Sequence, residues 1–388
     1  MNLEELKSQL LKQSKGNYIT TLGEDKDMIW LTSPAKDLNR ILSGSLYNSV
    51  QIGNHTAIIG PEASGKSSFM ALMLADAQKK GYLPVVIDAE GAWEKSFVER
   101  WGIDANNVIR IKSLFIEDVL VEFAKFIDNG YTNLAIAIDS IGALESKKMI
   151  RDGVEGDVKA DQGRLQKDIK RFLKMLVSLT KFNECISFSA GHYYGNPTGY
   201  GEPEKVGGGH YYKLSADIII TLKKYPIYSN PSAKTKKDKG EIIGTSIKAA
   251  TMKNRKYPPF QECTVNIDFK NGVDELAGLF DVAKDIGLIE QSGAWYTCDI
   301  LSLRTQGESK FYNELRNMDY QPLLDKIEEY IKTTGYSSIN TSLELQEEQK
   351  EELSDVEVEE KLDDENSKKN VEVTKLTKKK PGRPKKDK

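Results

Sequence analysis

The glycine-rich stretch GPEASGKSS, from Gly60 to Ser68, restricts the possible folds of this chain more than any other feature. It follows the apolar run Thr56–Ile59 and leads into the helix-forming run Ser68–Ala75. This is the order of strand, loop and helix that the pattern G-x-x-x-x-G-K-S requires. Backbone N–H groups of such a loop, together with the helix N-terminus, face an anion. The pattern predicts a phosphate-binding loop, and the alternative is an ordinary glycine-rich turn before a helix.

Each residue of this loop has an expected role. Lys66 would reach the β- and γ-phosphates of ATP, and the Ser67 hydroxyl would bind Mg²⁺. The residues expected to bind the nucleotide are Gly60, Pro61, Glu62, Ala63, Ser64, Gly65, Lys66, Ser67 and Ser68.

The rest of the chain alternates short apolar runs with longer helical patterns. Strands are predicted at residues 56–59, 84–88, 107–111, 134–139, 185–190 and 217–222, and residues 163–182 carry an apolar helical stripe. Such alternation predicts an α/β fold, in which a doubly wound, mostly parallel sheet has helices on both faces. Ligands of these sheets bind beyond the carboxyl ends of the strands, where the phosphate-binding loop falls.

Composition shifts divide the chain into four expected segments. Residues 1–29 contain an amphipathic helix within 2–13, which either packs on its own domain or docks on a neighbouring subunit. Residues 30–270 would form the core, with a basic loop at 223–240 and strands at 241–251 and 262–270. Residues 271–335 would form a small α/β domain, with a helix at 276–286 and a short strand near Trp295. Residues 336–388 would be a disordered tail.

The tail changes the sign of its charge along its length. Residues 344–365 are dominated by Glu and Asp, whereas residues 367–388 hold ten Lys or Arg against Glu372 and Asp387. Within the basic part, Arg383 lies in a Gly-Arg-Pro sequence that resembles an AT-hook, which inserts arginine into a narrow A·T minor groove. A nonspecific polybasic tail is the alternative, and both interpretations make it a DNA tether.

Composition excludes several classes of protein. The 388 residues carry a net charge of −3, which argues against a uniformly basic DNA-coating surface. The N-terminus lacks an apolar secretory segment and no apolar run is long enough to span a membrane. Three cysteines without C-x-x-C spacing argue against a disulfide framework or a zinc site. We therefore expect a soluble, cytoplasmic protein with no membrane partner.

Two carboxylates follow other predicted strands. The run Leu134–Asp139 ends in Asp139, as in a Walker B strand, and Asp139 would hold Mg²⁺ through water. Glu90 follows the strand at 84–88, beside the expected γ-phosphate position, where it can orient water as a general base. A helix-capping or solvated glutamate is the alternative for Glu90.

Five stretches resemble the RecA family of strand-exchange recombinases, with the nearest similarity to the phage UvsX type. They are GPEASGKSS, VIDAEGAW, AIAIDSIGAL and MKNRKYPPFQECTVNIDFKNGV followed by GLIEQSGAWY, in order between Trp30 and Tyr296. The Walker motifs alone indicate a P-loop ATPase, and the last two stretches are more specific. The resemblance implies a DNA-dependent ATPase that uses ATP and Mg²⁺ and forms a helical homo-oligomer on single-stranded DNA. It also implies strand exchange with homologous duplex DNA and single-strand-binding and loader proteins as partners. The expected location is the host cytoplasm, for a phage protein, or the nucleoid.

The resemblance also implies roles for single residues. Glu90 matches the catalytic glutamate, and Phe97 falls where an aromatic ring stacks on adenine, with a core Phe as the alternative. His192 matches the polar residue that senses the γ-phosphate, where many bacterial relatives carry Gln and UvsX-like members carry His. Lys253 and Arg255 match a pair of cations that reach the ATP bound by the adjacent subunit.

Two segments match the family's DNA-binding loops, although each taken alone would be an ordinary mobile loop. The first spans residues 145–162, and its expected DNA contacts are Lys147, Lys148 and Arg151. The second spans residues 193–213, and its expected contacts are Lys205, Gly207, Gly208, Gly209, His210 and Lys213. Two other functions share parts of this pattern: a ring-forming helicase of the same fold, and a nonenzymatic DNA-coating mediator with a degenerate ATP site.

Overall fold

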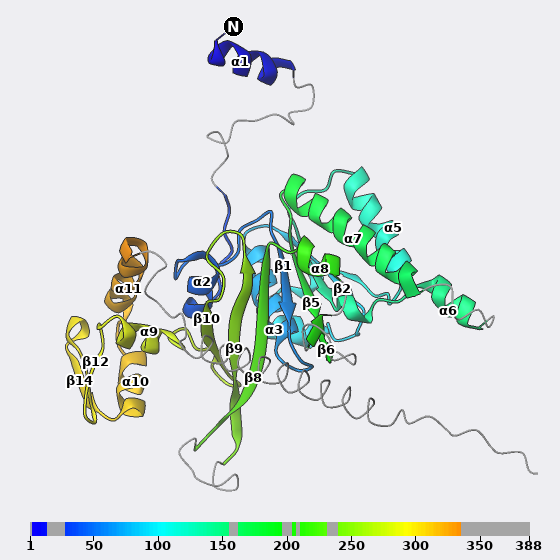
Figure 1. Cartoon of the computed structure of the whole chain (residues 1–388). Coiled ribbons are helices and arrows are strands. Elements are labelled where there is room, and N and C mark those ends of the chain that lie inside the picture. The colour runs from blue at the N-terminus through cyan, green and yellow to red at the C-terminus, as the bar shows by residue number, and fades with distance from the viewer. Residues whose placement is uncertain are drawn as a thin grey trace, which may run out of the picture. The chain divides into compact units, whose positions relative to one another are not determined.

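The structure is a computed structural model that describes residues 2–13, 28–154, 162–195, 204–206, 210–230 and 240–334 (Figure 1). The chain divides into two units, Met1–Ile339 and Asn340–Lys388, and only the first contains described residues. The expected tail with Arg383, and the glycines Gly207, Gly208 and Gly209, lie outside the described residues.

A nine-stranded sheet forms the centre of the described fold, in the order β11-β10-β9-β8-β1-β5-β4-β2-β3. The strands from β8 to β3 pair in parallel, whereas β9, β10 and β11 add on as antiparallel neighbours. Their bounds are β1 (His55–Ile59), β2 (Leu83–Asp88), β3 (Ile109–Ile111), β4 (Leu134–Asp139), β5 (Ile186–Gly191), β8 (Ile218–Tyr228), β9 (Ile242–Asn254), β10 (Glu262–Asp268) and β11 (Gly272–Val273). The apolar runs are buried because the sheet is covered on both faces.

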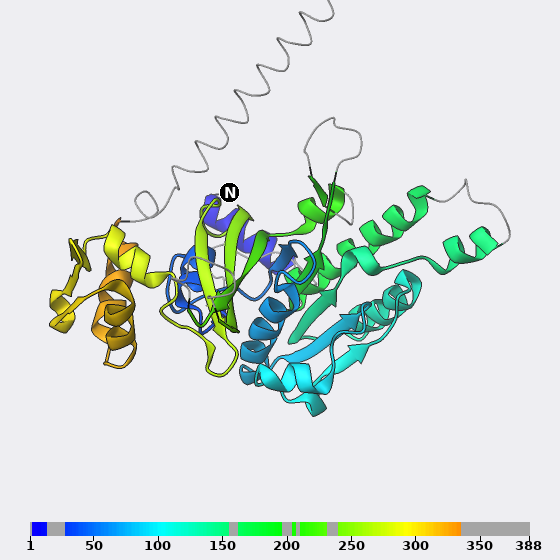
Figure 2. The same ribbon diagram turned by 90° about the horizontal axis from the view of Figure 1, so that it is seen from below.

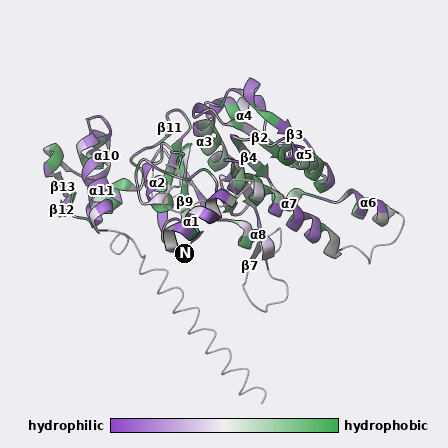
Figure 3. Ribbon diagram, turned by 90° about the horizontal axis from the view of Figure 1, so that it is seen from above, coloured by the Kyte–Doolittle hydropathy of each residue, from purple (hydrophilic) through white to green (hydrophobic). Residues whose placement is uncertain are grey.

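Helices cover both faces of this sheet (Figures 1 and 2). The helices α2 (Lys36–Ser43) and α3 (Lys66–Lys79) pack on one face, and α5 (Ile116–Asp128) and α7 (Gln162–Phe182) pack on the other. Figure 3 shows the central strands in the colour of hydrophobic residues and many hydrophilic residues on the helices. Alternate side chains along each central strand therefore belong to different buried clusters, one on each face of the sheet, as a doubly wound sheet requires.

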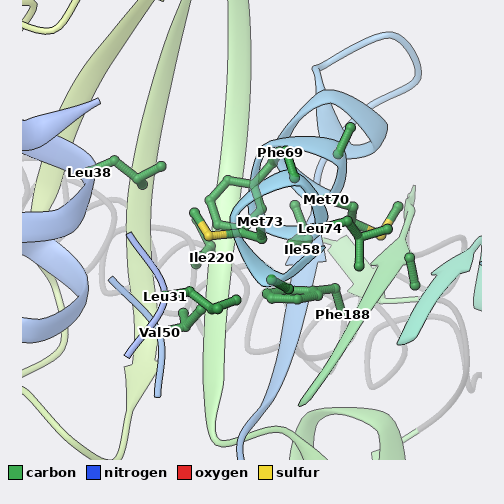
Figure 4. Close-up of a cluster of buried hydrophobic side chains, with 14 of the residues drawn as sticks. Leu31, Leu38, Val50, Ile58, Phe69, Met70, Met73, Leu74, Phe188 and Ile220 are labelled. Carbon is green, nitrogen blue, oxygen red and sulfur yellow. The ribbon is translucent and has the colours of Figure 1, made fainter. Parts of the chain in front are cut away.

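The helix after the phosphate-binding loop is almost wholly enclosed. Phe69, Met73 and Leu74 of α3 lie against Ile58 of β1 and Phe188 of β5 (Figure 4). This packing fixes the first turn of α3, and with it the loop, against the carboxyl ends of the central strands.

The C-terminal part of the described chain is a smaller α/β region with its own core. Its antiparallel sheet consists of β12 (Glu290–Ser292), β13 (Trp295–Cys298) and β14 (Leu303–Gln306), and its helices are α9 (Leu279–Asp285), α10 (Glu308–Arg316) and α11 (Gln321–Thr334). Buried Glu328 of α11 accepts hydrogen bonds from Ser45 Oγ, at 2.8 Å, and from the Leu46 N–H, at 2.7 Å. These bonds join the region to the loop after α2.

The remaining elements are short. They are α1 (Leu3–Gln13), α4 (Lys95–Arg100), α6 (Lys147–Val154), β6 (Tyr193–Gly195), β7 (Glu204–Val206), α8 (His210–Ser215) and three single turns of 3₁₀ helix at Ala105–Asn107, Ile141–Ala143 and Asp299–Leu301. Cys185, Cys263 and Cys298 are buried and free. Among the described residues, no helix is both long and apolar enough to cross a bilayer.

The predicted α/β class and mostly parallel sheet are confirmed, and several predicted boundaries are wrong. The expected loop at 223–240 begins later, because β8 continues to Tyr228 as a ribbon paired with β9. The first expected DNA loop contains α6, and the second contains β6, β7 and α8. The strand predicted at 107–111 begins only at Ile109. The longer β8 and the elements within the two loops are polar segments whose regular structure composition does not reveal, whereas β3 begins late because Asn107 belongs to a turn of 3₁₀ helix.

Candidate active site and the segments around it

The loop from Gly60 to Lys66 turns tightly at the carboxyl end of β1. Gly65 has a φ of +100° at the start of α3, a conformation that favours glycine. The Gly60 N–H donates to the Gly191 carbonyl of β5 at 3.2 Å, which ties the loop to the next strand. Lys66 Nζ donates to the carbonyls of Gly60, at 3.0 Å, and Pro61, at 2.7 Å. Burial lowers the pKa of Lys66, although nearby carboxylates oppose this.

Two oxygen ligands suited to Mg²⁺ meet at this edge of the sheet. Ser67 Oγ, in the first turn of α3, donates to Asp139 Oδ2 at the end of β4, at 2.6 Å. Hydroxyl and carboxylate oxygens are the kind of ligand that Mg²⁺ takes alongside phosphates and water. Asp139 is buried, and burial raises its pKa because it disfavours the charged carboxylate; a bound cation would offset that cost. The residues present therefore fit the ion that the sequence predicts.

Glu90, His192 and Lys66 form a cluster beside that site. His192, directly after β5, brings Nε2 to 3.4 Å from Glu90 Oε1 and Nδ1 to 3.4 Å from Lys66 Nζ. An ammonium group can only donate, so Nδ1 accepts in this arrangement and the Nε2 proton faces Glu90. The Glu90 side chain is 39% exposed, which leaves its carboxylate accessible to water.

Sequence reasoning missed the side chains that hold the turn bearing Glu90. Asp88 is buried and accepts from the N–H groups of Ala92 and Trp93, while Arg110 pairs with its carboxylate. The Trp93 indole donates to Asp139 at 2.9 Å. Asp88 and Trp93 both belong to the run VIDAEGAW, but only the fold shows that the Trp93 indole reaches Asp139 at the end of β4.

Phe97 lies on α4, in the neighbourhood of this turn. Its ring is partly buried and meets the edge of Trp93, with ring centres 5.3 Å apart and planes at 82°. Phe97 therefore takes part in the core packing that the sequence offered as its alternative role. Adenine stacking by Phe97 stays a prediction.

Lys253 and Arg255 lie at the opposite edge of the sheet from the loop. Arg255 donates to the Asp217 carboxylate at 3.0 Å, and Asp217 is bonded to the backbone of His55, where β1 begins. Lys253 Nζ donates to three carbonyls at the end of α8, those of Lys213, Leu214 and Ala216. The five residues of β1 separate these cations from the loop by roughly 16 Å. In one subunit they are therefore remote from the loop's own nucleotide position.

The structure describes the side chains of some expected DNA contacts and only the backbone of others. Lys147, Lys148 and Arg151 are exposed on α6, which follows β4, and Lys147 pairs with Asp118 of α5. Figure 1 shows α6 projecting away from the sheet. Lys213 is half-buried in α8. The backbones of Lys205 and His210 belong to β7 and α8, and their side chains are outside the described part of the chain.

A buried polar chain under His192 was also missed. Tyr212 of α8 is fully buried, and its hydroxyl lies 3.0 Å from both Oγ and the carbonyl of Ser189. Ser189 Oγ also lies 3.3 Å from Nε2 of buried His55. The ring of Tyr212 fills the space beside Gly191, where a Cβ atom would come within 2.8 Å of it. The helix α8, at the end of the second expected DNA loop, thus packs directly on β5, the strand that precedes His192.

Comparison with known proteins agrees with this arrangement. A family model described as the RecA N-terminal domain matches residues 8–274. Protein RecA of Porphyromonas gingivalis is 29% identical over 85% of this chain and 96% of its own length. Protein RecA of Ruminococcus albus is 28% identical over 79% of this chain and 75% of its own, and that of Wolinella succinogenes is 30% identical over 68% and 74%. With the family match spanning the sheet, the loop and the residues gathered around it, the chain belongs to the RecA family.

Proposed function

We propose that this protein is an ATP-dependent recombinase that assembles on single-stranded DNA and exchanges strands with a homologous duplex. One observation carries the proposal beyond a general P-loop ATPase. Lys253 and Arg255 lie on the sheet edge opposite Lys66, about the length of β1 away. Cations so located can serve an ATP bound by the next subunit but not one bound by their own. Subunits joined head to tail in this way form a helix when each step includes a translation.

The residues of the loop edge divide the chemistry among them. Lys66 and the N–H groups at the start of α3 would bind the phosphates, and Ser67 and Asp139 would hold Mg²⁺. The ion supplies charge neutralisation on the phosphate oxygens when bound. Glu90 would orient the attacking water, and His192 lies between Glu90 and Lys66, within reach of a terminal phosphate. Lys253 and Arg255 of the adjacent subunit would complete the site.

DNA binding would fall to the two segments that follow β4 and β5. Both begin next to residues of the nucleotide site, Asp139 and His192, so the nucleotide state can bias their conformation. The exposed cations of α6 and the glycines at 207–209 suit a strand backbone with little sequence preference.

The alternatives are less well supported. A ring helicase of this fold would share the nucleotide-site motifs, but the family model and the curated relatives that match this chain are RecA proteins. A nonenzymatic mediator would tolerate loss of Lys66, Ser67, Glu90 or Asp139, and all four are present in one constellation.

Finer parts of the proposal concern origin, partners and tail. The sequence resemblance to the UvsX type supports a phage protein of the host cytoplasm that works with single-strand-binding and loader proteins.

Residues 367–388, with Arg383, would act as an AT-hook-like tether to duplex DNA. Deleting them should weaken duplex binding and lower its salt dependence, and unchanged duplex affinity would refute the tether.

ATP hydrolysis with and without single-stranded DNA, with electron microscopy of the same samples, tests the main proposal. We expect strong stimulation by DNA together with long helical filaments, and loss of both in Lys66→Ala. Stimulated hydrolysis in discrete rings would favour the helicase, and hydrolysis that is absent or indifferent to DNA would favour the mediator.

A further inference from the structure

The turn that carries Glu90 is fastened at both of its ends. At its start, the N–H groups of Ala89 and Glu90 donate to the Asp139 carbonyl, at 2.9 and 3.3 Å. At its end, the N–H groups of Ala92 and Trp93 donate to the two oxygens of Asp88, at 3.0 and 3.3 Å. The position of Glu90 therefore depends on the ends of two adjacent strands, β2 and β4.

Trp93 adds a bond from this turn to the metal carboxylate itself. Its side chain is 3% exposed, and its indole Nε1 donates to Asp139 Oδ2 at 2.9 Å. The same oxygen accepts from Ser67 Oγ. Ser67 is itself expected to bind Mg²⁺, so Trp93 is the donor to this oxygen that has no part in coordination. A neutral N–H donor fixes a carboxylate without competing for charge.

The indole also contacts the residue expected at the adenine. The Trp93 ring meets Phe97 edge to face, and its backbone is held through Asp88 by Arg110. One buried side chain thus connects the metal carboxylate, the turn of Glu90 and the start of α4.

We propose that Trp93 is a positioning residue that orients Asp139 for Mg²⁺ and keeps the turn of Glu90 in register with it. This inference rests on the proposed nucleotide site. The competing interpretation is a core tryptophan whose N–H is merely satisfied by the nearest acceptor.

Trp93→Phe distinguishes the positioning role from a core-packing role, because it removes the N–H donor and retains an aromatic ring. Binding of a fluorescent ADP analogue is measured while Mg²⁺ is titrated, and again in excess EDTA. We expect the Mg²⁺ concentration for half-maximal tightening to rise about tenfold, as for the loss of one hydrogen bond to a charged group. Affinity in EDTA should stay unchanged.

Trp101→Phe is the matched control. Its indole N–H is also buried but has no hydrogen-bond partner among the described residues, so the same substitution removes no contact to the site. The Mg²⁺ dependence of Trp101→Phe should match that of the wild type. If Trp93→Phe shows the wild-type Mg²⁺ dependence with only a lower melting temperature, the positioning role is wrong. If the wild type itself fails to bind the ADP analogue, the proposed nucleotide site fails instead.

A second measurement covers the case in which Trp93→Phe does not fold. The chain has four tryptophans, and replacing Trp30, Trp101 and Trp295 by Phe leaves Trp93 as the only one. With ADP bound, adding Mg²⁺ should change the emission of Trp93, because its acceptor Asp139 changes environment. Emission that does not respond to Mg²⁺ would overturn the proposal.

Discussion

His55 is fully buried at the start of β1, with each ring nitrogen facing a serine hydroxyl. Nδ1 lies 2.8 Å from Ser187 Oγ, and Nε2 lies 3.3 Å from Ser189 Oγ. Burial lowers the pKa of His55 from 6.5 to about 4, and the carboxylate of Asp217 opposes this only in part. The neutral ring is therefore part of the folded state at neutral pH.

Acid should destabilise the fold through this histidine. In the unfolded chain His55 takes up a proton near pH 6.5, whereas in the folded chain it does so only near pH 4. Stability is thus lost as the pH falls from about 6.5 to about 4, by about 2 kcal/mol at pH 5. Urea unfolding at pH 7 and pH 5 measures the loss, and in His55→Gln the loss should be smaller by that amount. An equal loss in both proteins would contradict the assignment.

The positions of site residues that follow from spacing along the chain were predictable, and the contacts that follow from the fold were not. Lys66 and Ser67 follow from the loop pattern, and Asp139 follows from the end of an apolar strand. The roles of Trp93 and Arg110 depend on where β3 and β4 lie beside β2, which is a property of strand order. A tryptophan in sequence signals burial but not its hydrogen-bond acceptor.

At the scale of elements, strongly apolar strands were located to within a residue or two, and polar elements were not. The buried strands β1, β2, β4 and β5 match their predicted runs. The outer half of β8 reads Lys-Lys-Tyr-Pro-Ile-Tyr, with no apolar alternation, so its pairing with β9 makes it a strand. The helix α8 has only 6 residues, which is too few for an apolar helical pattern to be recognised in the sequence.

The anchoring of α8 gives a prediction at this scale. Tyr212→Phe removes a buried hydroxyl that bonds to Oγ and the carbonyl of Ser189, so it should cost about 1–2 kcal/mol of unfolding free energy. Tyr211→Phe is the control on the same helix, because Tyr211 makes its contact through the ring, 5.4 Å from Lys170 Nζ. It should change stability by less than about 0.5 kcal/mol. Equal effects in urea unfolding would show that the Tyr212 hydroxyl is not an anchor.

At the scale of the whole molecule, the fold places the charged residues proposed for the ATP site at two opposite edges of one sheet. The loop edge carries Lys66 and Glu90, and the far edge carries Lys253 and Arg255. In a single subunit both far-edge cations are bonded internally, to α8 and to Asp217. They would have to exchange these partners for phosphate oxygens when a second subunit docks, so hydrolysis should depend on assembly.

Mixing two inactive variants tests that dependence. Glu90→Ala lacks the carboxylate that we propose orients water on the loop edge, and Arg255→Ala lacks the cation on the far edge. Where the loop of an Arg255→Ala subunit meets the far edge of a Glu90→Ala subunit, every group is present. With random order in an equal mixture, such contacts are about a quarter of the total, so about a quarter of wild-type ATP hydrolysis should return.

The control for the mixture is Lys256→Ala, which removes an exposed cation beside Arg255. Alone it should retain activity, which separates the role of Arg255 from the general charge of the far edge. Mixing the two inactive variants at several ratios should give recovery that is greatest near equality and falls toward either pure protein. Activity that is simply the weighted mean of the two variants at every ratio would mean that each site is completed within one subunit, and the head-to-tail arrangement would be wrong.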